Sequence, residues 1–320
     1  MNEKGEVGPE TRTKVLAAAA ALRYGPDAAA RALVSHRTMR VGLVVGDNSG
    51  HRDLSLVFFG KVLAEISRRL TDSGYEAVLL NPADSPQRTS PLDPSLGHRV
   101  DAAILIGVDQ TDLVIHDLVE ARLPCVGVDV RCDWAGSAWV GPDHVEGIRL
   151  AVRHLYALGH RRIAHIAGGA NTVAGSERLN AFREELEALG LDLPDEYVRP
   201  GDFSSSSGYR EACSLLALPA PPTAIAAASD LMALAALQAA WDFGLEPGHD
   251  LAVVGFDDLE AASLSHPRLT TIRQDRTALG ALAAARLLEL VQHPDATPTK
   301  TLLPVELVVR ASTGAIRPAA

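Results

Sequence analysis

The chain of 320 residues contains only three cysteines. Three thiols do not suggest the disulfide framework of a small secreted protein, and a chain of this length can bury substantial cores without one. No apolar run approaches the roughly 20 residues of a membrane span, and the N-terminus lacks the basic and then apolar layout of a secretory signal. We therefore expect a globular protein of the cytoplasm with no membrane partner.

The sequence also lacks the short motifs of common enzyme classes. No Gly-x-Gly-x-x-Gly follows the first predicted strand, no Gly-x-Ser-x-Gly is present, and residues 168–172 lack the lysine of a phosphate-binding loop. The histidines and cysteines nearest to one another lack the spacing of known metal sites: His154, His160, His165, Cys125 and Cys132. We interpret them as structural residues, and we expect no enzymatic activity, no metal and no cofactor.

Negative charge dominates the sequence but not its N-terminus. The formal net charge is −10, which argues against a protein that coats nucleic acid over its whole surface. Residues 1–40 nevertheless hold seven Lys and Arg against four acids, a net of +3 that leaves −13 for the remaining 280 residues. A small basic arm on an acidic body is typical of local phosphate contact beside a non-binding domain. A solvated basic terminus would account for these charges almost as well.

From Arg40 onward, short apolar runs alternate with amphipathic stretches. The predicted strands are mostly continuous apolar runs, as in strands buried on both faces of a parallel sheet: residues 41–45, 77–80, 102–106, 125–128, 163–166, 224–227, 251–254 and 302–309. The predicted helices, several of which stop at a glycine, are residues 57–72, 146–158, 177–189, 230–243 and 279–292. This rhythm predicts doubly wound α/β architecture. About ten such strands are too many for one compact sheet, so we expect two subdomains with a ligand cleft between the carboxyl ends of their strands.

The order of the elements predicted in the first forty residues, and of several later motifs, is similar to that of a known family. A capped helix from about Val7 to Tyr24 precedes a Tyr-x-Pro step, an Ala-rich segment at residues 26–33, a basic linker and the first strand. Seven motifs follow along the body: LGHRRIA at 158–164, ERLNAF at 177–182, GDF at 201–203 with SGY at 207–209, DLMA at 230–233, VGFDD at 254–258, LTTIRQ at 269–274 and ELVVRASTG at 306–314. Together they resemble the lac repressor / galactose repressor family of transcription regulators over essentially the whole chain.

The resemblance implies a fold and its division. We expect two doubly wound parallel-sheet subdomains of the type I periplasmic-binding-protein-like kind, preceded by a partial helical DNA-binding headpiece. The residual headpiece, a third helix and a hinge helix, would occupy residues 1–39. The N-subdomain would comprise residues 40–142 and 274–303, and the C-subdomain residues 143–273 and 304–314.

By the same resemblance, Arg178, Asp257 and Phe203 match effector-contacting positions, and Asp129 matches a fourth. They lie at predicted strand ends or helix starts, where side chains can face a cleft. An arginine offers a charged fork of donors, an aspartate offers acceptors for vicinal hydroxyls, and a phenylalanine offers an apolar face for a sugar ring or base. A structural ion pair or a core aromatic is the alternative for each.

Three further residues complete the expected effector site: Ser229, Asp47 and Gln274. Ser229 stands where sugar-binding members commonly carry Asn. Asp47 belongs to residues 46–54, which replace the family's Pro-Asp-x-x-Asn-Pro-Phe pattern. This loop adds charge to the cleft wall and suggests a more polar or anionic effector.

The Ala-rich segment resembles the hinge helix of the family, which lies in the DNA minor groove as a pair, one from each subunit of a dimer. Leu33 matches the leucine that wedges between base pairs, with Ala29 and Arg31 before it. An ordinary helical linker is the alternative. Residues 57–70 are a candidate dimer surface, with a buried intrachain helix face as the alternative.

Met1 stands where the recognition helix of the family ends. We therefore expect the helix-turn-helix to be missing, through a start assigned too late, a cut or a natural truncation, and operator binding to be weak or absent. The sequence as a whole predicts a ligand-responsive transcription regulator, a repressor, that forms a homodimer or tetramer and binds a sugar-like or other polar metabolite. A periplasmic-type solute-binding protein and an effector sensor that has lost DNA binding are the alternatives.

Overall fold

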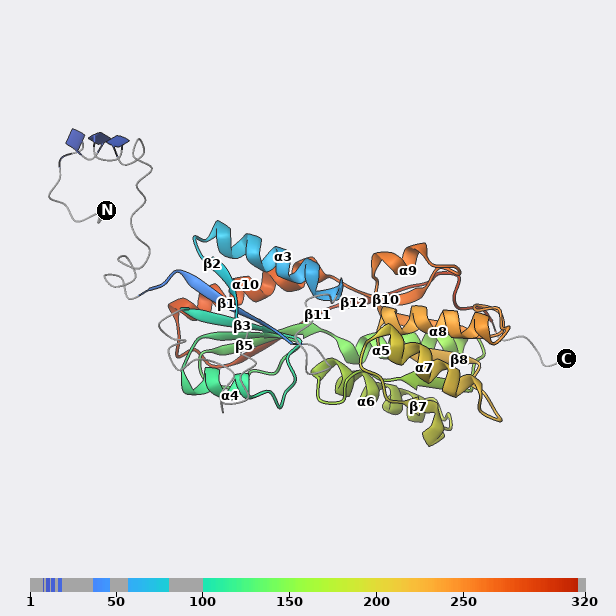
Figure 1. The fold of residues 1–320 in the computed structure, drawn as a ribbon. Coiled ribbons are helices and arrows are strands. Elements are labelled where there is room, and N and C mark those ends of the chain that lie inside the picture. Colours follow the sequence, from blue (N-terminus) through green and yellow to red (C-terminus); the bar gives the residue numbers. More distant parts are fainter. Residues whose placement is uncertain are drawn as a thin grey trace, which may run out of the picture.

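The computed structural model describes residues 37–46, 57–80 and 100–315, together with residues 8, 10, 11, 13, 14, 17 and 18. It contains two six-stranded sheets, each flanked by helices (Figure 1). The first has the strand order β11-β5-β4-β3-β1-β2 and is parallel throughout. The second has the order β12-β10-β9-β8-β6-β7, in which only β12 runs antiparallel to its neighbour. The predicted α/β class with two doubly wound sheets is confirmed.

The first lobe is built on the first sheet. Its elements are β1 (Arg40–Val45), α3 (Val57–Asp72), β2 (Glu76–Leu79), β3 (Ala102–Ile106), α4 (Leu113–Glu120), β4 (Cys125–Val128), β5 (Ser137–Pro142), α10 (Arg276–Gln292) and β11 (Thr299–Leu303). Helices α3 and α10 pack together on one face of the sheet, and α4 packs on the other. A Cβ at Gly280 would lie 2.6 Å from the backbone oxygen of Val62, so α10 approaches α3 this closely only because residue 280 has no side chain.

The second lobe is built on the second sheet. Its elements are α5 (His144–Ala157), β6 (Ile163–Ile166), α6 (Val173–Ala188), a 3₁₀ turn (Asp195–Tyr197), β7 (Val198–Arg199), α7 (Ser205–Leu216), β8 (Ala224–Ala227), α8 (Asp230–Asp242), β9 (Ala252–Asp257), α9 (Glu260–Leu264), β10 (Thr270–Gln274) and β12 (Val305–Val308). One core lies under α5 and α6, and the other under α7 and α8. All-apolar strands such as β8 suit this double burial.

The chain crosses between the two lobes three times, after β5, after β10 and after β11. We propose that these crossovers mark the predicted subdomain borders. The third crossover corrects one prediction. Residues 302–309 do not form one strand, because Pro304 has no N–H for a ladder and separates β11 in the first sheet from β12 in the second.

Two other expectations change in detail. The helix predicted from Glu177 begins earlier, at Val173, because the Thr172 hydroxyl caps it by accepting the Gly175 N–H. One face of α3, the candidate dimer surface, is an intrachain face, since Val62 and Ile66 are fully buried in the first lobe. The residues exposed on its other face are Lys61, Ala64, Arg68 and Arg69. Capping thus sets where α6 begins, and tertiary packing sets which face of α3 is buried; the hydrophobic pattern alone determined neither.

The three histidines interpreted as structural all have partners within the second lobe. His154 bonds the Thr313 hydroxyl, His160 lies 3.0 Å from the Gly314 carbonyl oxygen, and His165 bonds the Ala226 carbonyl oxygen. The first two attach the C-terminal segment to α5 and to the loop after it. The geometry thus gives each ring a packing and tethering role.

Near the N-terminus, Glu10, Thr11, Thr13, Lys14, Ala17 and Ala18 are helical and exposed, within the predicted third helix of the headpiece. The predicted hinge residues Ala29, Arg31 and Leu33 lie outside the described residues. In the part of the chain that the structure describes, no helix is both long and apolar enough to cross a membrane.

Candidate functional site

A cleft lies where the two lobes meet, with about 640 Å³ of space between protein atoms, including the open solvent at its mouth. The first lobe supplies Phe58 and Phe59 from α3, Gly107 after β3 and Asp129 after β4. The second lobe supplies Thr172, Ala174, Arg178, Phe203, Ser229, Leu231, Asp257 and Leu259. Most of these residues follow the carboxyl ends of parallel strands, where such folds bind ligands.

Arg178 is the charged centre of the cleft. It lies on α6, is 3% exposed, and its guanidinium stacks on the Phe256 ring with 3.7 Å between the guanidinium carbon and the ring centroid. Its Nη1 donates to the carbonyl oxygen of Ala228, and its Nε donates to Nδ1 of His144 at 3.2 Å. Burial lowers the pKa of Arg178, but a guanidinium stays charged at neutral pH. Among the described residues, Nη2 makes no hydrogen bond, in contrast to Nε and Nη1.

Asp129 faces Arg178 from the first lobe through a shared histidine. His144 Nε2 lies 3.1 Å from Asp129 Oδ1, and the ring is 1% exposed. Asp129 has a φ of 55°, a conformation that costs energy for a residue with a side chain. Gly141 makes room for it, because a Cβ there would lie 2.7 Å from Asp129 Oδ1. A strained turn and one hydrogen bond thus fix the Asp129 carboxyl at the cleft.

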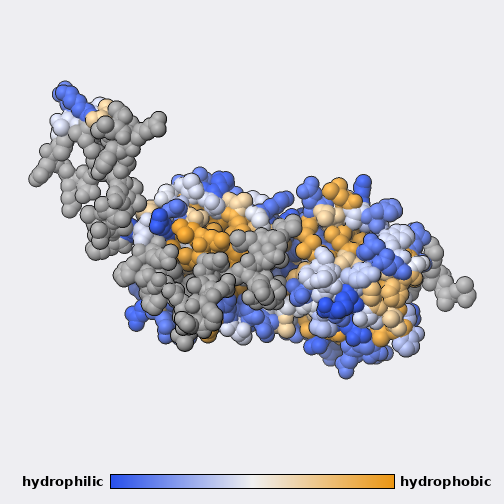
Figure 2. Space-filling model, viewed as in Figure 1, coloured by the Kyte–Doolittle hydropathy of each residue, from blue (hydrophilic) through white to orange (hydrophobic). Residues whose placement is uncertain are grey.

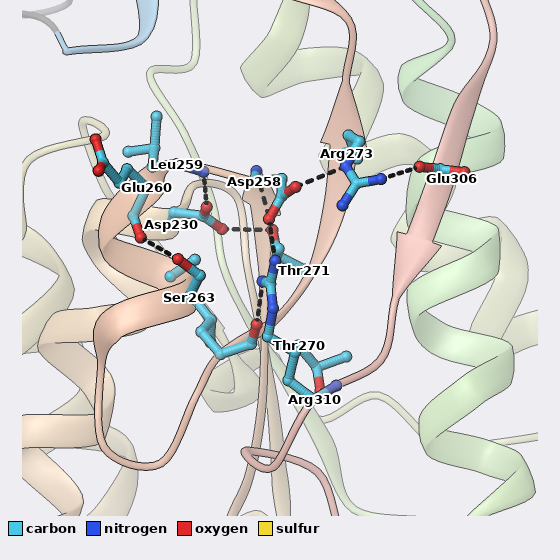
Figure 3. A network of polar contacts seen from close by, with 12 residues as sticks. Asp230, Asp258, Leu259, Glu260, Ser263, Thr270, Thr271, Arg273, Glu306 and Arg310 are labelled. Atoms are coloured by element: carbon cyan, nitrogen blue, oxygen red, sulfur yellow. Dashed lines mark hydrogen bonds and ion pairs between the residues drawn. The ribbon is translucent and has the colours of Figure 1, made fainter.

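Asp257 ends β9 in a turn that a polar network supports (Figure 3). Asp257 has a φ of 131° and Asp258 a φ of 51°. Asp258 accepts from Arg273 Nε at 2.6 Å and from Arg310 Nη2 at 2.5 Å. Buried Asp230 accepts the Leu259 N–H at 2.7 Å and the Thr271 hydroxyl. These bonds stabilise a backbone that most residues avoid, and they fix where the Asp257 carboxyl stands.

The Asp257 carboxyl itself is buried and accepts a side-chain hydrogen bond. Gln274 Nε2 at the end of β10 donates to Asp257 Oδ1 at 2.7 Å. Burial raises the pKa of Asp257 to about 8, although Arg178 opposes this shift. Burial thus favours the protonated form of this carboxyl, which can offer a ligand a hydroxyl donor as well as an acceptor.

Aromatic rings form the apolar walls of the cleft. Phe58 and Phe59 lie edge to face with 5.1 Å between ring centroids. Phe203, with a φ of 67°, sits over Gly168, where a Cβ would come within 2.1 Å of its ring. Ser229 lines the same wall, but its hydroxyl caps α8 by accepting the Met232 N–H at 3.3 Å. Flat apolar walls around converging donors and acceptors suit a ring-shaped polar ligand.

The structure brings Arg178, Asp257, Phe203, Asp129 and Ser229 to one cleft, with Gln274 directly behind Asp257. Asp47 lies outside the described residues. Sequence reasoning missed His144, Phe58 and Phe59. The two phenylalanines begin a predicted helix after the first strand, which is a usable signal, whereas nothing around His144 in the sequence marks it as buried.

Comparisons with known proteins agree with this site and fold. Residues 152–313 match the family described as periplasmic binding protein-like domain. The HTH-type transcriptional regulator CelR of Thermobifida fusca is 33% identical over 98% of this chain and 92% of its own length. The lactose operon repressor of Escherichia coli is 32% identical over 98% of this chain and 85% of its own length. The chain belongs to the lac repressor / galactose repressor family.

Solved structures of family members superimpose on this fold. A lac repressor dimer bound to operator and an anti-inducer has a TM-score of 0.81 at 32% identity, covering 98% of this chain and 93% of its own. A complex of the regulator CelR with cellobiose has a TM-score of 0.76 at 31% identity, covering 97% of this chain and 92% of its own. The family match thus holds in sequence and in three dimensions, and it makes the chain a regulator of transcription rather than a transport protein.

Proposed function

We propose that this protein regulates transcription in response to a neutral, hydroxyl-rich small molecule, a sugar, bound in the cleft between the lobes. The balance of charge in the cleft carries this proposal. The ionisable residues that line it within the described chain are one arginine and two aspartates. An anionic effector would meet the acidic side chain of Asp129 at close range, whereas the hydroxyls of a neutral sugar can use Asp129 as an acceptor and the buried Asp257 carboxyl as a donor or an acceptor.

Three phenylalanine rings complete the argument for a sugar. Phe58, Phe59 and Phe203 offer apolar faces to the C–H faces of a pyranose or furanose, while Arg178 and the two aspartates bind its edge. The relatives support the same class of ligand, since one is a ribose operon repressor and one has been solved with cellobiose. The proposal keeps the sequence expectation of a sugar-like metabolite. The loop at residues 46–54 suggested a more polar or anionic effector, and the proposal leaves out the anionic option.

The proposed action follows from the cleft's position. A ligand that bonds both Asp129 and Arg178 favours the state in which the lobes are close, and so shifts the population toward it. We propose that the protein acts as a homodimer on operator DNA in the cytoplasm and performs no catalysis. Apolar surface over α9 (Figure 2), with Leu264 76% exposed, supports a self-association surface on the second lobe.

A ligand screen by thermal unfolding tests the proposal. The panel contains neutral pentoses, hexoses and disaccharides, their phosphate esters and free nucleobases. The proteins are wild type, Arg178→Ala, and Arg183→Ala as a matched control on the exposed face of the same helix. We expect a neutral sugar to raise the melting temperature of wild type and the control, and to lose this effect in Arg178→Ala.

Each protein is compared with its own ligand-free melting curve, because removing a buried arginine lowers stability by itself. Equal ligand shifts in wild type and Arg178→Ala would show that the cleft site is wrong. Shifts confined to phosphate esters would show that the effector class is wrong.

A further inference from the structure

His144 occupies the first crossover between the lobes. It is the first residue of α5, directly after β5 has left the first sheet and Asp143 has capped the helix. Its ring is 1% exposed and lies 5.9 Å from the Phe256 ring, centroid to centroid. Phe256 can come this close to α5 because a Cβ at Gly147 would stand 2.6 Å from it. The histidine is thus packed in place at a point through which the lobes are joined.

Both ring nitrogens of His144 are used, and their roles are fixed. Arginine has no acceptor, so the bond from Arg178 Nε requires an unprotonated Nδ1. The ring proton is therefore on Nε2 and is donated to Asp129 Oδ1. A neutral histidine in a single tautomer links the cation of the second lobe to the carboxylate of the first.

Other polar contacts between the lobes include exposed and backbone contacts. Gln110 N–H donates to the Asn171 carbonyl oxygen at 3.1 Å, and Arg276 Nη2 donates to the Asp258 carbonyl oxygen at 3.2 Å. The ion pair of Arg131 with Glu177 is 3.0 Å long, but the arginine side chain is 56% exposed. Water competes for an exposed pair of this kind. The His144 linkage, by contrast, is buried and joins two residues of the cleft.

We infer that His144 is a positioning residue that holds the two lobes in their close arrangement by linking Arg178 to Asp129. The linkage uses one donor of Arg178 and one oxygen of Asp129, and leaves Nη2 and Oδ2 for the ligand. Rotation of either side chain by a bound effector is therefore transmitted to the other lobe through the ring. That last step rests on the proposed function, whereas the linkage of Arg178 to Asp129 through His144 does not.

The experiment measures the distance between the lobes without any ligand, by double electron–electron resonance. Spin labels are attached to Leu113→Cys on α4 and Ala188→Cys on α6, both exposed, in a Cys213→Ser background; the other two cysteines are buried. Labelled protein is diluted with unlabelled protein so that distances within one chain dominate. His144→Leu removes both hydrogen bonds, whereas His144→Gln retains one donor and one acceptor.

We expect His144→Leu to shift and broaden the distance distribution and His144→Gln to restore a narrow one near that of wild type. Asp129→Ala cuts the same linkage at its other end and should reproduce the Leu result, which keeps the test decisive if His144→Leu fails to fold. His154→Leu, a histidine on the same helix that bonds Thr313 within the second lobe, should match wild type. Wild-type distances in both His144→Leu and Asp129→Ala, or a Gln variant as perturbed as the Leu variant, would overturn the inference. Because no sugar is present, this outcome is independent of the ligand screen.

Discussion

Asp257 gives the folded protein a distinctive dependence of stability on pH. Asp257 is 6% exposed. Burial raises the pKa of its carboxyl from an ordinary 3.8 to about 8, although the nearby Arg178 acts to lower it. Between these two values the folded chain keeps a proton that the unfolded chain has released. Because the folded state binds more protons in this window, the free energy of unfolding falls as the pH rises through it.

Asp257→Asn removes this titration and keeps an oxygen for the Gln274 amide to bond. One proton of difference corresponds to about 1.4 kcal/mol for each pH unit. From about pH 6.5 to 7.5, wild type should therefore lose about 1.4 kcal/mol relative to the variant. This window lies above the titration of Asp230, whose pKa burial raises to about 6, so Asp230 adds little to the difference.

Urea unfolding followed by tryptophan fluorescence at a series of pH values measures this difference. Asp192→Asn, an exposed aspartate of the second lobe, serves as the control and should follow wild type. The difference between wild type and Asp257→Asn should stop growing above about pH 8, where the folded carboxyl has ionised. Parallel pH profiles for these two proteins between pH 6.5 and 7.5 would refute the reasoning.

Two further predictions concern packing and the turn network. Gly280→Ala should lower the free energy of unfolding by about 1–3 kcal/mol because its Cβ would press on the Val62 backbone, whereas Gly60→Ala, with open space at its Cβ, should raise it by about 0.5–1 kcal/mol. Thr271→Val should cost about 1–3 kcal/mol by leaving buried Asp230 without its hydroxyl donor, and Thr271→Ser should recover most of that loss. Urea unfolding checks both; equal effects of the two glycine variants, or of Val and Ser, would contradict them.

Part of the fold was predictable because several strands are buried on both faces and are therefore rich in apolar residues. Strands β3, β4, β6 and β8 have the predicted bounds; β3, β4 and β8 contain no polar side chain, and β6 contains only His165. Strand β5, Ser137–Pro142, is also buried along its whole length but was not predicted.

Strand β10, Thr270–Gln274, was not predicted as a strand because four of its five residues are polar. Two of them support groups near the cleft, since Thr271 donates to Asp230 and Gln274 donates to Asp257. Thr270 bonds Ser312 and Thr313 of the C-terminal segment, and Arg273 pairs with Asp258 and Glu306. These polar contacts replace the apolar pattern by which the other strands were found.

The site was predictable only in part, and for a related reason. Arg178, Asp257, Phe203 and Asp129 were assigned by family resemblance, and the structure gives them one cleft; their contact with an effector stays a prediction. His144 could not be found in this way. Its role arises from two hydrogen bonds, to residues 15 and 34 positions away in the chain. The sequence around His144 cannot indicate such distant contacts.

The hydrogen-bonding capacity of the polar side chains in the cleft determines how the cleft would respond to a ligand. Arg178, Asp129 and Asp257 each have some of their hydrogen-bonding capacity tied to protein and some left without a partner in the described chain. The hydrogen bonds that these side chains make within the protein fix their orientation before a ligand binds. The side chains therefore lose little conformational freedom on binding. The donors and acceptors that remain without a protein partner come from both lobes. A ligand that bonds them therefore adds further links between the lobes beside the one through His144. Ligand affinity and lobe closure should then change together, so His144→Leu should weaken ligand binding even though the ring does not line the cleft.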